Sequence, residues 1–530
     1  MKNKGRDDAQ VKEVFMTTEH ILMLVTIAAY LLMMLFVGYK FSKSNNDSGD
    51  FYLGGRKLGP FVTAMSAEAS DMSGWLLMGL PGVALAGSIA EASWTAIGLA
   101  VGTYINWLIV AKRIRIYTEK CNNSITIPEF FSNRWHDNAG ILKAIAAIII
   151  VIFFVPYTAS GFSACGKLFS TIFAIDYVPA MIISAVVIVG YTALGGFLAA
   201  STTDFIQSIV MTAALIFVLG FGVVNAGGFG AVIENAKAIP GYFSLTSLNT
   251  DALSGAGTVG GYDALTIAST LAWGLGYFGM PHILLRFMAA KDEKKLSLSR
   301  RVATIWVCIS MAVAIGIGII GNKLVANGVV TGLTDAETII VLLADVISKY
   351  GWIFAIVGGL VLSGILASTM STADSQLLNA ASSISEDLFK GVFKIKISRK
   401  TNMLVARLTV LAIAVVGVII ALNKDSSVFK IVSFAWAGFG ATFGPVVLCA
   451  LFWKRSTKWG ALAGMITGAV MVFVWKFVIA KLGGVFAIYE LLPAFILAFA
   501  AIIIVSLITK APNKQITDEF DSVASEIKAK

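Results

Sequence analysis

Ser66-Ala-Glu-Ala-Ser-Asp-Met-Ser-Gly-Trp75 interrupts an apolar segment near the start of the chain, and Gly79-Leu-Pro-Gly82 follows it. Far downstream, Trp273-Gly-Leu-Gly-Tyr-Phe-Gly-Met-Pro281 interrupts a second apolar segment in the same way. Interrupted membrane helices at corresponding positions of two halves mark a binding site in inverted-repeat architectures. The alternative is that both segments are simply flexible, glycine-rich membrane helices.

The composition around these segments is that of a membrane protein. Hydrophobic residues make up 57% of the 530-residue chain and charged residues 14%, whereas soluble domains have about 45–50% and about 25%. Apolar runs recur along the whole sequence and reach the ~20 residues that cross a bilayer. Because backbone groups in lipid must be paired within their own segment, these runs predict helices. We expect an all-α polytopic protein in the lipid bilayer with about 13 transmembrane helices.

The expected spans follow one another closely. They cover residues 19–41, 60–82, 89–111, 141–171, 177–199, 204–227, 263–289, 302–325, 352–385, 402–422, 427–453, 459–482 and 487–509. An amphipathic stretch at 335–349 is expected on the membrane surface. Five regions follow from this division: an N-terminal segment (1–59), a first five-helix set (60–227), an extracellular loop (228–262), a second five-helix set (263–453), and two final helices with a tail (454–530).

The positive charge lies in alternate loops between the spans. Some loops carry clusters such as Lys112, Arg113 and Arg115, or Lys454 and Arg455. The loops that alternate with them have few basic residues. By the positive-inside rule, this asymmetry predicts a plasma-membrane protein with its N-terminus outside and its C-terminus cytoplasmic. The net charge of +10 is therefore a topology signal, and no nucleic-acid partner is expected.

Catalytic chemistry is not indicated. The three histidines are scattered, and the sequence contains no G-x-x-x-x-G-K-[ST] phosphate loop. The tail after Lys510 is too short for a catalytic module. We expect no enzyme, and any energy source must be an ion gradient or a partner.

Asp71 is the most informative single residue. A charged side chain near the middle of a membrane costs at least ~2.5–3.5 kcal/mol, so it is functional unless it is paired. Its span offers no basic neighbour, which favours a bound cation or a substrate ammonium as the partner. The alternative is a buried structural hydrogen bond. Unwound carbonyls at Ala69 and Met72 would suit Na⁺, and free amides after Ser73 and Gly74 would attract a carboxylate.

Two further segments carry polar or aromatic groups of interest. The ninth span contains Ser363-Gly-Ile-Leu-Ala-Ser-Thr-Met-Ser-Thr-Ala-Asp-Ser375, whose hydroxyls suit a hard cation but can also bond their own i−4 carbonyls. Trp273 and Tyr277 are four residues apart, so a helical turn would place both rings on one face. They could enclose an aliphatic ring or a cation, or simply pack.

The chain resembles the sodium/solute symporter family, and within it the proline carriers. The resemblance covers nearly the whole sequence. Its motifs are Leu53-Gly-Gly-Arg-Lys-Leu-Gly-Pro-Phe-Val-Thr-Ala64, Ala69 to Gly82, Trp273 to His282, Arg286-Phe-Met-Ala-Ala290 and Ala435-Trp-Ala-Gly-Phe-Gly-Ala441. The family implies a LeuT-like fold of two inverted five-helix repeats, with one extra N-terminal and two extra C-terminal helices. It also implies sodium-coupled symport of L-proline by alternating access.

The resemblance also implies roles for individual residues. The sodium ligands would be the carbonyls of Ala69, Met72 and Ser368 and the hydroxyls of Ser371 and Thr372. Coupling is assigned to Asp71, Arg56, Ser73 and Gly74, and substrate binding to Tyr157, Trp273, Tyr277 and Pro281. Two positions depart from the family pattern. Ser368 replaces an alanine, and Glu68 could add an acid to the cavity.

A second cation position is also suggested. Ser371, Asp374 and Ser375 are spaced i, i+3, i+4 and would share one helix face, and Asp204 matches a family aspartate that joins this face in some relatives. Two carboxylates with no basic neighbour would need a proton or a cation between them. The alternative is that Asp204 caps its helix and Asp374 is hydrated from the cytoplasm.

Other functions remain open at this point. The same site would serve a sodium symporter for another amino acid or for pantothenate. A membrane sensor that keeps the fold, or a channel, is the competing class.

Overall fold

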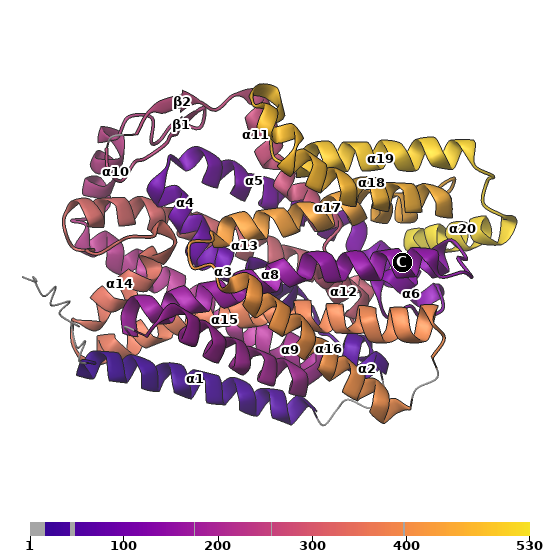
Figure 1. Cartoon of the computed structure of the whole chain (residues 1–530), viewed down its shortest axis with the longest axis horizontal. Coiled ribbons are helices and arrows are strands. Elements are labelled where there is room, and N and C mark those ends of the chain that lie inside the picture. Colours follow the sequence, from indigo (N-terminus) through magenta and orange to yellow (C-terminus); the bar gives the residue numbers. More distant parts are fainter. Residues whose placement is uncertain (1–15, 43–47, 174, 256, 396–397, 530) are drawn as a thin grey trace, which may run out of the picture.

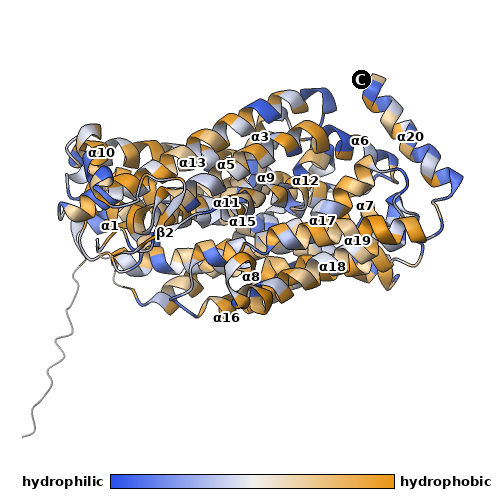
Figure 2. Ribbon diagram, turned by 90° about the horizontal axis from the view of Figure 1, so that it is seen from above, coloured by the Kyte–Doolittle hydropathy of each residue, from blue (hydrophilic) through white to orange (hydrophobic). Residues whose placement is uncertain are grey.

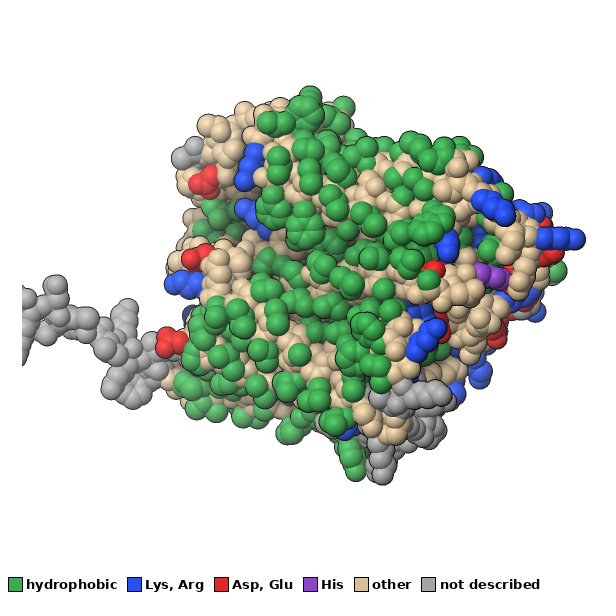
Figure 3. All heavy atoms as spheres, turned by 45° about the vertical axis from the view of Figure 1, so that its right-hand side comes forward, with side chains coloured by type: hydrophobic (Ala, Val, Ile, Leu, Met, Phe, Trp, Pro, Cys, Tyr) green, Lys and Arg blue, Asp and Glu red, His purple; other side chains and the backbone are tan. Residues whose placement is uncertain are grey.

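The computed structural model describes residues 16–42, 48–173, 175–255, 257–395 and 398–529, and nearly all of its regular structure is helical. Within these residues, ten helices are long and apolar enough to cross a membrane. They run side by side along the long axis of the molecule (Figure 1). Hydrophobic side chains cover the middle of the face in Figure 3, and Lys and Arg gather toward its ends. The prediction of a helical polytopic membrane protein is confirmed.

Ten stretches meet this criterion of length and apolar composition. They are Thr18–Lys40, Ile89–Lys120, Ile141–Phe173, Gly195–Asn225, Glu293–Ala326, Trp352–Val392, Leu404–Ala421, Val428–Phe452, Lys458–Leu482 and Leu491–Ile508. Their burial separates centre from periphery: 72% and 89% of the apolar windows in Trp352–Val392 and Val428–Phe452 are buried, against 22% in Lys458–Leu482. Two shorter apolar stretches, Tyr177–Gly190 and Ala264–Phe278, accompany them.

The predicted second span is broken, as its sequence indicates. It consists of α3 (Pro60–Gly74), the wider-turned segment η2 (Trp75–Gly79) and α4 (Leu80–Ala86). Pro60 begins α3, where its missing N–H costs nothing. The break falls at Ser73, whose φ of 34° and ψ of −171° lie outside the helical region. A non-glycine residue in such a conformation is sparsely populated and costs about 1–3 kcal/mol.

The predicted seventh span is broken as well. It consists of α11 (Ala264–Leu271), the tighter segment η4 (Ala272–Phe278) and α12 (Pro281–Ala289). The Asp263 side chain accepts a hydrogen bond from the Thr266 amide and caps α11. Pro281 begins α12 and cannot donate to the preceding turn. Both predicted interruptions are therefore confirmed.

Spans five and six form one continuous assignment, α9 (Tyr177–Asn225). Its bend lies at Gly196, whose φ of 69° favours glycine. The expected boundary between 199 and 204 is wrong by several residues. Asp204 consequently lies inside α9 and does not begin a helix, so the capping alternative for Asp204 is also wrong.

The other helices connect and surround the two broken spans. In chain order they are α1 (Thr18–Ser42), α2 (Ser48–Leu53), η1 (Gly54–Arg56), α5 (Ile89–Ile105), η3 (Asn106–Ala111), α6 (Lys112–Lys120), α7 (Ile127–Arg134), α8 (Ile141–Phe173), η5 (Glu293–Lys295), α13 (Leu296–Ala326), α15 (Trp352–Ser382), η7 (Ser383–Val392), α16 (Arg399–Ala421), α17 (Val428–Phe452), α18 (Lys458–Phe477), η8 (Ile479–Leu482), η9 (Gly484–Phe486) and α19 (Leu491–Ile508).

One end of the bundle carries the expected 228–262 loop, which is folded. It contains α10 (Phe229–Ala238) and an antiparallel hairpin in which β1 (Ser247–Asn249) pairs with β2 (Val259–Gly261), Leu248 opposite Gly260. These elements lie together at the end of the bundle opposite α6 and α20 (Figure 1).

Two amphipathic segments differ from expectation. The 335–349 stretch, expected on the membrane surface, forms η6 (Ala336–Thr338) and α14 (Ile339–Ser348). Six apolar residues of α14 are buried within the protein, because it packs against α15 and α4. The polar tail forms α20 (Lys514–Ala529), which packs Phe520 against Tyr117 of α6. Figure 2 shows α20 as a helix of mixed hydrophilic and hydrophobic residues.

Candidate ion and substrate site

The break in α3 lies against α15, and this contact builds the candidate sodium site. The Ser371 hydroxyl donates to the Ala69 carbonyl at 2.8 Å and to the Ser368 carbonyl at 3.2 Å. The Thr372 hydroxyl donates to Ser368 O at 3.0 Å. All of these residues are buried, as is Met72. The predicted oxygens of α3 and α15 are therefore brought together, and Ser371 reaches across between the helices.

Hard oxygen donors of this kind fit a sodium ion. Carbonyl and hydroxyl oxygens are neutral, so the group suits a monovalent cation with a nearby carboxylate better than a divalent one. The Ser368 hydroxyl donates to Ile365 O at 2.8 Å, back into its own helix. The Ser368 hydroxyl, which stands where the family has an alanine, is therefore engaged by its own helix. The i−4 bond of Thr372 shows that the competing interpretation also applies in part.

Asp71 points toward the second broken span. Its carboxylate accepts a hydrogen bond from the Tyr277 hydroxyl at 2.7 Å, and its backbone carbonyl accepts one from the Tyr157 hydroxyl at 3.0 Å. No ion pair with Lys or Arg is formed by Asp71 in the described part of the chain. The carboxylate therefore has a hydrogen-bond partner but no positively charged partner among the described residues. This arrangement favours a bound cation beside it.

A small cavity adjoins Asp71 and Met72. Its wall is mainly apolar and aromatic, formed by Trp75, Leu99, Tyr157, Trp273, Val432 and Trp436. The cavity has a volume of about 10 Å³, room for about one water molecule, so a larger ligand requires its aromatic wall to move apart. Such surroundings suit a small molecule with one cationic group and an aliphatic body.

Trp273 is the centre of an aromatic cluster. Its ring centroid lies 5.4 Å from that of Phe429, 5.7 Å from Trp75 and 5.3 Å from Tyr489. The Trp436 indole donates to the Trp273 carbonyl at 2.7 Å. Sequence reasoning missed Trp436 as a wall residue, although it lies in one of the family motifs.

Tyr277 reaches the site differently from the prediction. The segment η4 has about three residues per turn, so residues four apart do not share a face. Trp273 lines the cavity, while Tyr277 packs edge-on against Trp436 and bonds Asp71. Pro281 and His282 are buried at the start of α12. Both His282 ring nitrogens have no partner among the described residues.

The premise for the second cation position is wrong in one respect, because Arg286 lies between the two carboxylates. Its guanidinium donates to Asp204 Oδ2 at 3.2 Å and to the Ser375 hydroxyl, and the Ser375 hydroxyl donates to Asp374 at 3.1 Å. The group is closed by Ser66, which donates to Asp204 at 2.7 Å. Asp204, Asp374 and Ser375 are thus brought together, but not without a basic neighbour.

The charge of this cluster is not balanced by the arginine alone. Asp204, Asp374 and Arg286 are all buried, and one guanidinium faces two carboxyl groups. Asp204 Oδ1 and Asp374 Oδ2 have no hydrogen-bond partner within the described residues. An uncompensated charge is costly in such an environment, so the cluster fits one proton or one small cation in addition to Arg286.

Arg56 lies at the end of the bundle that carries α6. It donates to Asn123 at 2.9 Å, to the Met288 carbonyl at 2.5 Å and to the Ser124 carbonyl at 3.0 Å. Burial lowers its pKa to about 10, so it stays charged at neutral pH. Arg56 therefore joins the start of α3 to the end of α12 and to the α6–α7 turn.

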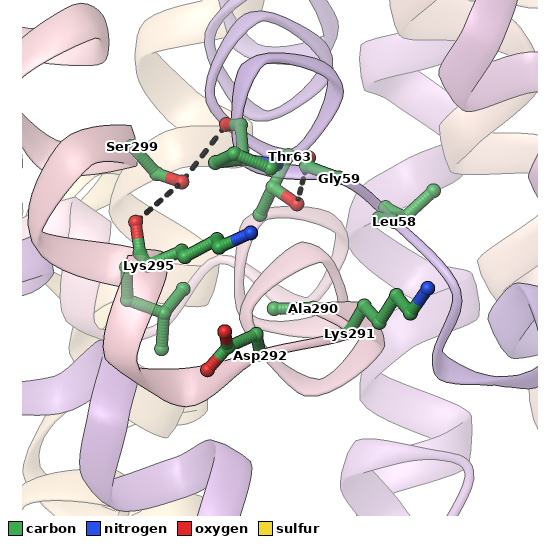
Figure 4. Close-up of a pocket in the computed structure, with 10 residues that line it drawn as sticks. Leu58, Gly59, Thr63, Ala290, Lys291, Asp292, Lys295 and Ser299 are labelled. Carbon is green, nitrogen blue, oxygen red and sulfur yellow. Dashed lines mark hydrogen bonds between the residues drawn. The ribbon is translucent and has the colours of Figure 1, made fainter.

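Figure 4 shows the seam that Arg56 flanks. The Leu58 amide donates to Ala289 O at 3.1 Å, and the Lys291 amide donates to Leu58 O at 2.9 Å. The Ser299 hydroxyl on α13 donates to Pro60 O at 2.8 Å. These bonds join the start of α3 to the end of α12 and to α13, around the pocket drawn in Figure 4.

Glu337 joins several helices at the opposite end of the bundle. Its carboxylate accepts from the Ser427 hydroxyl at 2.7 Å and from the amides of Val428 and Phe429 at the start of α17. Lys167 on α8 completes the group with an ion pair at 2.8 Å. Phe429, whose amide bonds Glu337, also packs on Trp273. The Glu337 group is therefore in contact with the cavity wall.

Glu68 does not line the cavity. Its Oε1 accepts from the Trp107 indole at 2.9 Å and from the Thr103 hydroxyl at 3.1 Å, both on the third span. The possibility that Glu68 adds an acid to the cavity is therefore not supported. It ties α3 to its neighbour instead.

Comparison with known proteins gives concordant matches. A family model described as the sodium:solute symporter family matches residues 51–468. The sodium/proline symporter of Haemophilus influenzae is 44% identical over 94% of this chain and 97% of its own length. The high-affinity proline transporter PutP of Bacillus subtilis is 43% identical over 92% and 98%, and the osmoregulated proline transporter OpuE of the same species is 42% identical over 93% and 96%.

Solved structures with the same fold include two symporters. The substrate-bound, outward-open Na⁺-coupled sialic acid symporter superposes with a TM-score of 0.75 at 17% identity, covering 93% of this chain and 98% of that one. The closed form of the nucleobase-cation-symport-1 transporter Mhp1 gives a TM-score of 0.52 at 13% identity, covering 89% and 98%. At these identities the likeness concerns the fold alone.

Proposed function

Because this chain belongs to the sodium:solute symporter family, we propose that it carries L-proline into the cell together with sodium ions. The observation that carries the proposal is the Ala69–Ser371 contact, which places sodium-type oxygens beside Asp71 and an aromatic cavity. Proline has an ammonium group, a carboxylate and an aliphatic ring. Asp71 suits the first, the N-terminal end of η2 after the α3 break suits the second, and the aromatic side chains suit the third.

The sites follow from this assignment. Sodium is held by the carbonyls of Ala69, Met72 and Ser368 with the hydroxyls of Ser371 and Thr372. Asp71, Ser73 and Gly74 couple sodium to the substrate, and Tyr157, Trp273, Tyr277 and Pro281 form or shape the proline pocket. Arg56 acts at the cytoplasmic closure.

The membrane arrangement is proposed as 13 spans in two inverted five-helix repeats, 60–227 and 263–453, after one helix in 1–59. Three stretches are supported as spans although they are too short or too interrupted to qualify alone: Pro60–Ala86, Tyr177–Gly190 and Ala264–Ala289. The 228–262 loop is extracellular, and the helices and tail of 454–530 end in the cytoplasm. The start of α1 and α20 lie at opposite ends of the bundle (Figure 1), which supports termini on opposite sides of the membrane.

Alternating access then uses the bonded groups at the two ends of the bundle, around Glu337 and around Arg56. Sodium at the α3–α15 contact favours the outward-open arrangement, and proline binds between the broken spans. Closure of the Glu337 group follows, and opening of the Arg56 seam releases both solutes into a cytoplasm low in sodium.

Uptake by proteoliposomes containing the purified chain tests this function. Radiolabelled proline should accumulate against its gradient when an inward sodium gradient is imposed, and not with potassium. A panel of other amino acids and pantothenate serves as the comparison. Accumulation of another solute in place of proline would change the substrate, and flux without accumulation would indicate a channel.

Ser371→Ala and Thr372→Ala test the sodium ligands. Each variant should raise the sodium concentration for half-maximal uptake, because the ion loses one hydroxyl ligand. A loss of ~1–2 kcal/mol corresponds to roughly 5- to 30-fold. Ser368→Ala is the matched control, because its hydroxyl bonds Ile365 O of its own helix and the carbonyl ligand is kept. Unchanged sodium dependence in both test variants would leave these hydroxyls as bonds to the backbone only.

We further propose that Asp204, Asp374 and Ser375 form a second cation position beside Arg286. Asp204→Asn and Asp374→Asn should each lower the sodium Hill coefficient or the charge moved per proline, because each leaves a single carboxylate, which Arg286 balances without a second cation. Current and isotope flux measured in the same proteoliposomes give both quantities. If both variants keep wild-type cooperativity and charge stoichiometry, the cluster binds no second sodium.

A further inference from the structure

One face of the third span lies directly on the second broken span. Gly98, Gly102 and Asn106 are four residues apart and so share a face of the helix. A Cβ on Gly102 would lie 2.3 Å from the Gly274 carbonyl oxygen, and one on Gly98 would lie 2.5 Å from Leu271 O. The two backbones are therefore in contact, and only glycine permits this approach. Asn106 continues the same face one turn further on.

Asn106 bonds a carbonyl that has lost its α-helical donor. In a continuous α-helix, the Tyr277 carbonyl would accept from the amide of residue 281. Residue 281 is proline and has no N–H, so this partner does not exist. The Asn106 side-chain amide donates to Tyr277 O at 3.0 Å instead. Asn106 is fully buried, where an unpaired carbonyl is costly.

The same part of the third span also holds the first broken span. Thr103 and Trp107, which lie three residues before and one residue after Asn106, both donate to Glu68 of α3. Asn106 itself begins the wider-turned segment η3, and such turns are frequent at functional sites. Residues 103–107 therefore bond to both spans that enclose the cavity.

We propose that Asn106 is a positioning residue for the substrate site, which replaces the hydrogen bond that Pro281 removes and so fixes Tyr277 against Asp71. The Tyr277 hydroxyl donates to Asp71, and Asn106 holds the carbonyl of the same residue. Tyr277 is thus secured at both ends. The inference rests on the proposed function, because it concerns the pocket assigned to proline.

Direct binding to the purified full-length protein tests this role. Asn106→Ala should raise the proline dissociation constant by about 5- to 100-fold, the range for one buried hydrogen bond. Sodium binding, measured without proline by tryptophan fluorescence, should change much less, because Ala69 and Ser371 are not touched. Asn106→Asp should be at least as damaging as Asn106→Ala, because a carboxylate offers the Tyr277 carbonyl no donor. Asn225→Ala is the control, since it removes an amide–carbonyl bond to Phe221 O, together with the bond that Asn225 accepts from Tyr350, outside the residues of the site.

A double variant separates positioning from general packing. Pro281→Ala restores an amide N–H at 281, so Asn106→Ala should weaken proline binding less in that background than in the wild type. Equal effects in both backgrounds, or equal losses of sodium and proline binding, would overturn the proposal. If Pro281→Ala does not bind proline, the comparison of Asn106→Ala with Asn106→Asp and the sodium measurement decide it alone. A wild-type protein that binds no proline would instead contradict the proposed function.

Discussion

Asp71→Asn is expected to abolish sodium-stimulated proline uptake while leaving the protein inserted and folded. The asparagine oxygen can still accept the hydrogen bond from Tyr277, so the shape of the site is kept. Only the negative charge is lost. Because no Lys or Arg pairs with Asp71 in the described residues, that charge is available to the transported cations, and a neutral amide cannot replace it.

The measurement is initial proline uptake in proteoliposomes with and without a sodium gradient, normalised to the amount of inserted protein. Tyr277→Phe is the matched control. It keeps the charge and removes the hydrogen bond, so it should weaken proline binding but retain stimulation by sodium. Normal sodium-dependent transport by Asp71→Asn would remove Asp71 from the coupling role.

The broken spans could be predicted because their signals are local. A cluster of Gly, Ser and Pro inside an apolar run has few structural alternatives, and both interruptions are found where the sequence places them. The residues in the breaks are also local in sequence, so Ala69, Met72 and Asp71 could be named together. Their contact with Ser371 needed the family resemblance, because nothing in the sequence between α3 and α15 indicates which face of α15 meets α3.

The aromatic wall could be predicted only in part. Trp273 lies in a broken span and drew attention for that reason, but Trp436, Phe429 and Tyr489 lie in ordinary apolar segments. Their role depends on how three distant helices pack. The helical-face argument for Tyr277 failed because η4 has a tighter turn than an α-helix, and sequence spacing alone does not give the turn type.

The position of Arg286 in the sequence already indicates a buried ion pair. An ionisable residue inside a predicted span, 263–289, requires a partner within the protein. Asp204 and Asp374 are buried acids on two other predicted spans, so a pairing among the three was open to prediction. The positive-inside count directed attention to loop residues and away from this one. Lys167 in the fourth span, which pairs with Glu337, follows the same pattern.

The second large effect is expected for Arg286→Met, which should strongly reduce the amount of folded protein. Arg286 is 1% exposed and Asp204 is fully buried, and the arginine also bonds Ser66 and the His282 carbonyl. Removing one partner of a buried pair costs about 3–5 kcal/mol, because the other charge is left without compensation. That is a large share of the ~5–15 kcal/mol that stabilises a folded protein.

The compensating variant makes the electrostatic cause testable. Arg286→Met with Asp204→Asn removes one negative charge together with the positive one, so folded protein should be recovered in part relative to Arg286→Met alone. Detergent-extracted, monodisperse protein and its thermal inactivation temperature are the quantities to compare. Arg301→Met, which changes an exposed arginine on the next helix, α13, should have little effect. If the double variant is no more stable than Arg286→Met, the loss comes from packing around the guanidinium and not from the stranded carboxylates, because only the charge explanation predicts recovery when a second polar group is changed.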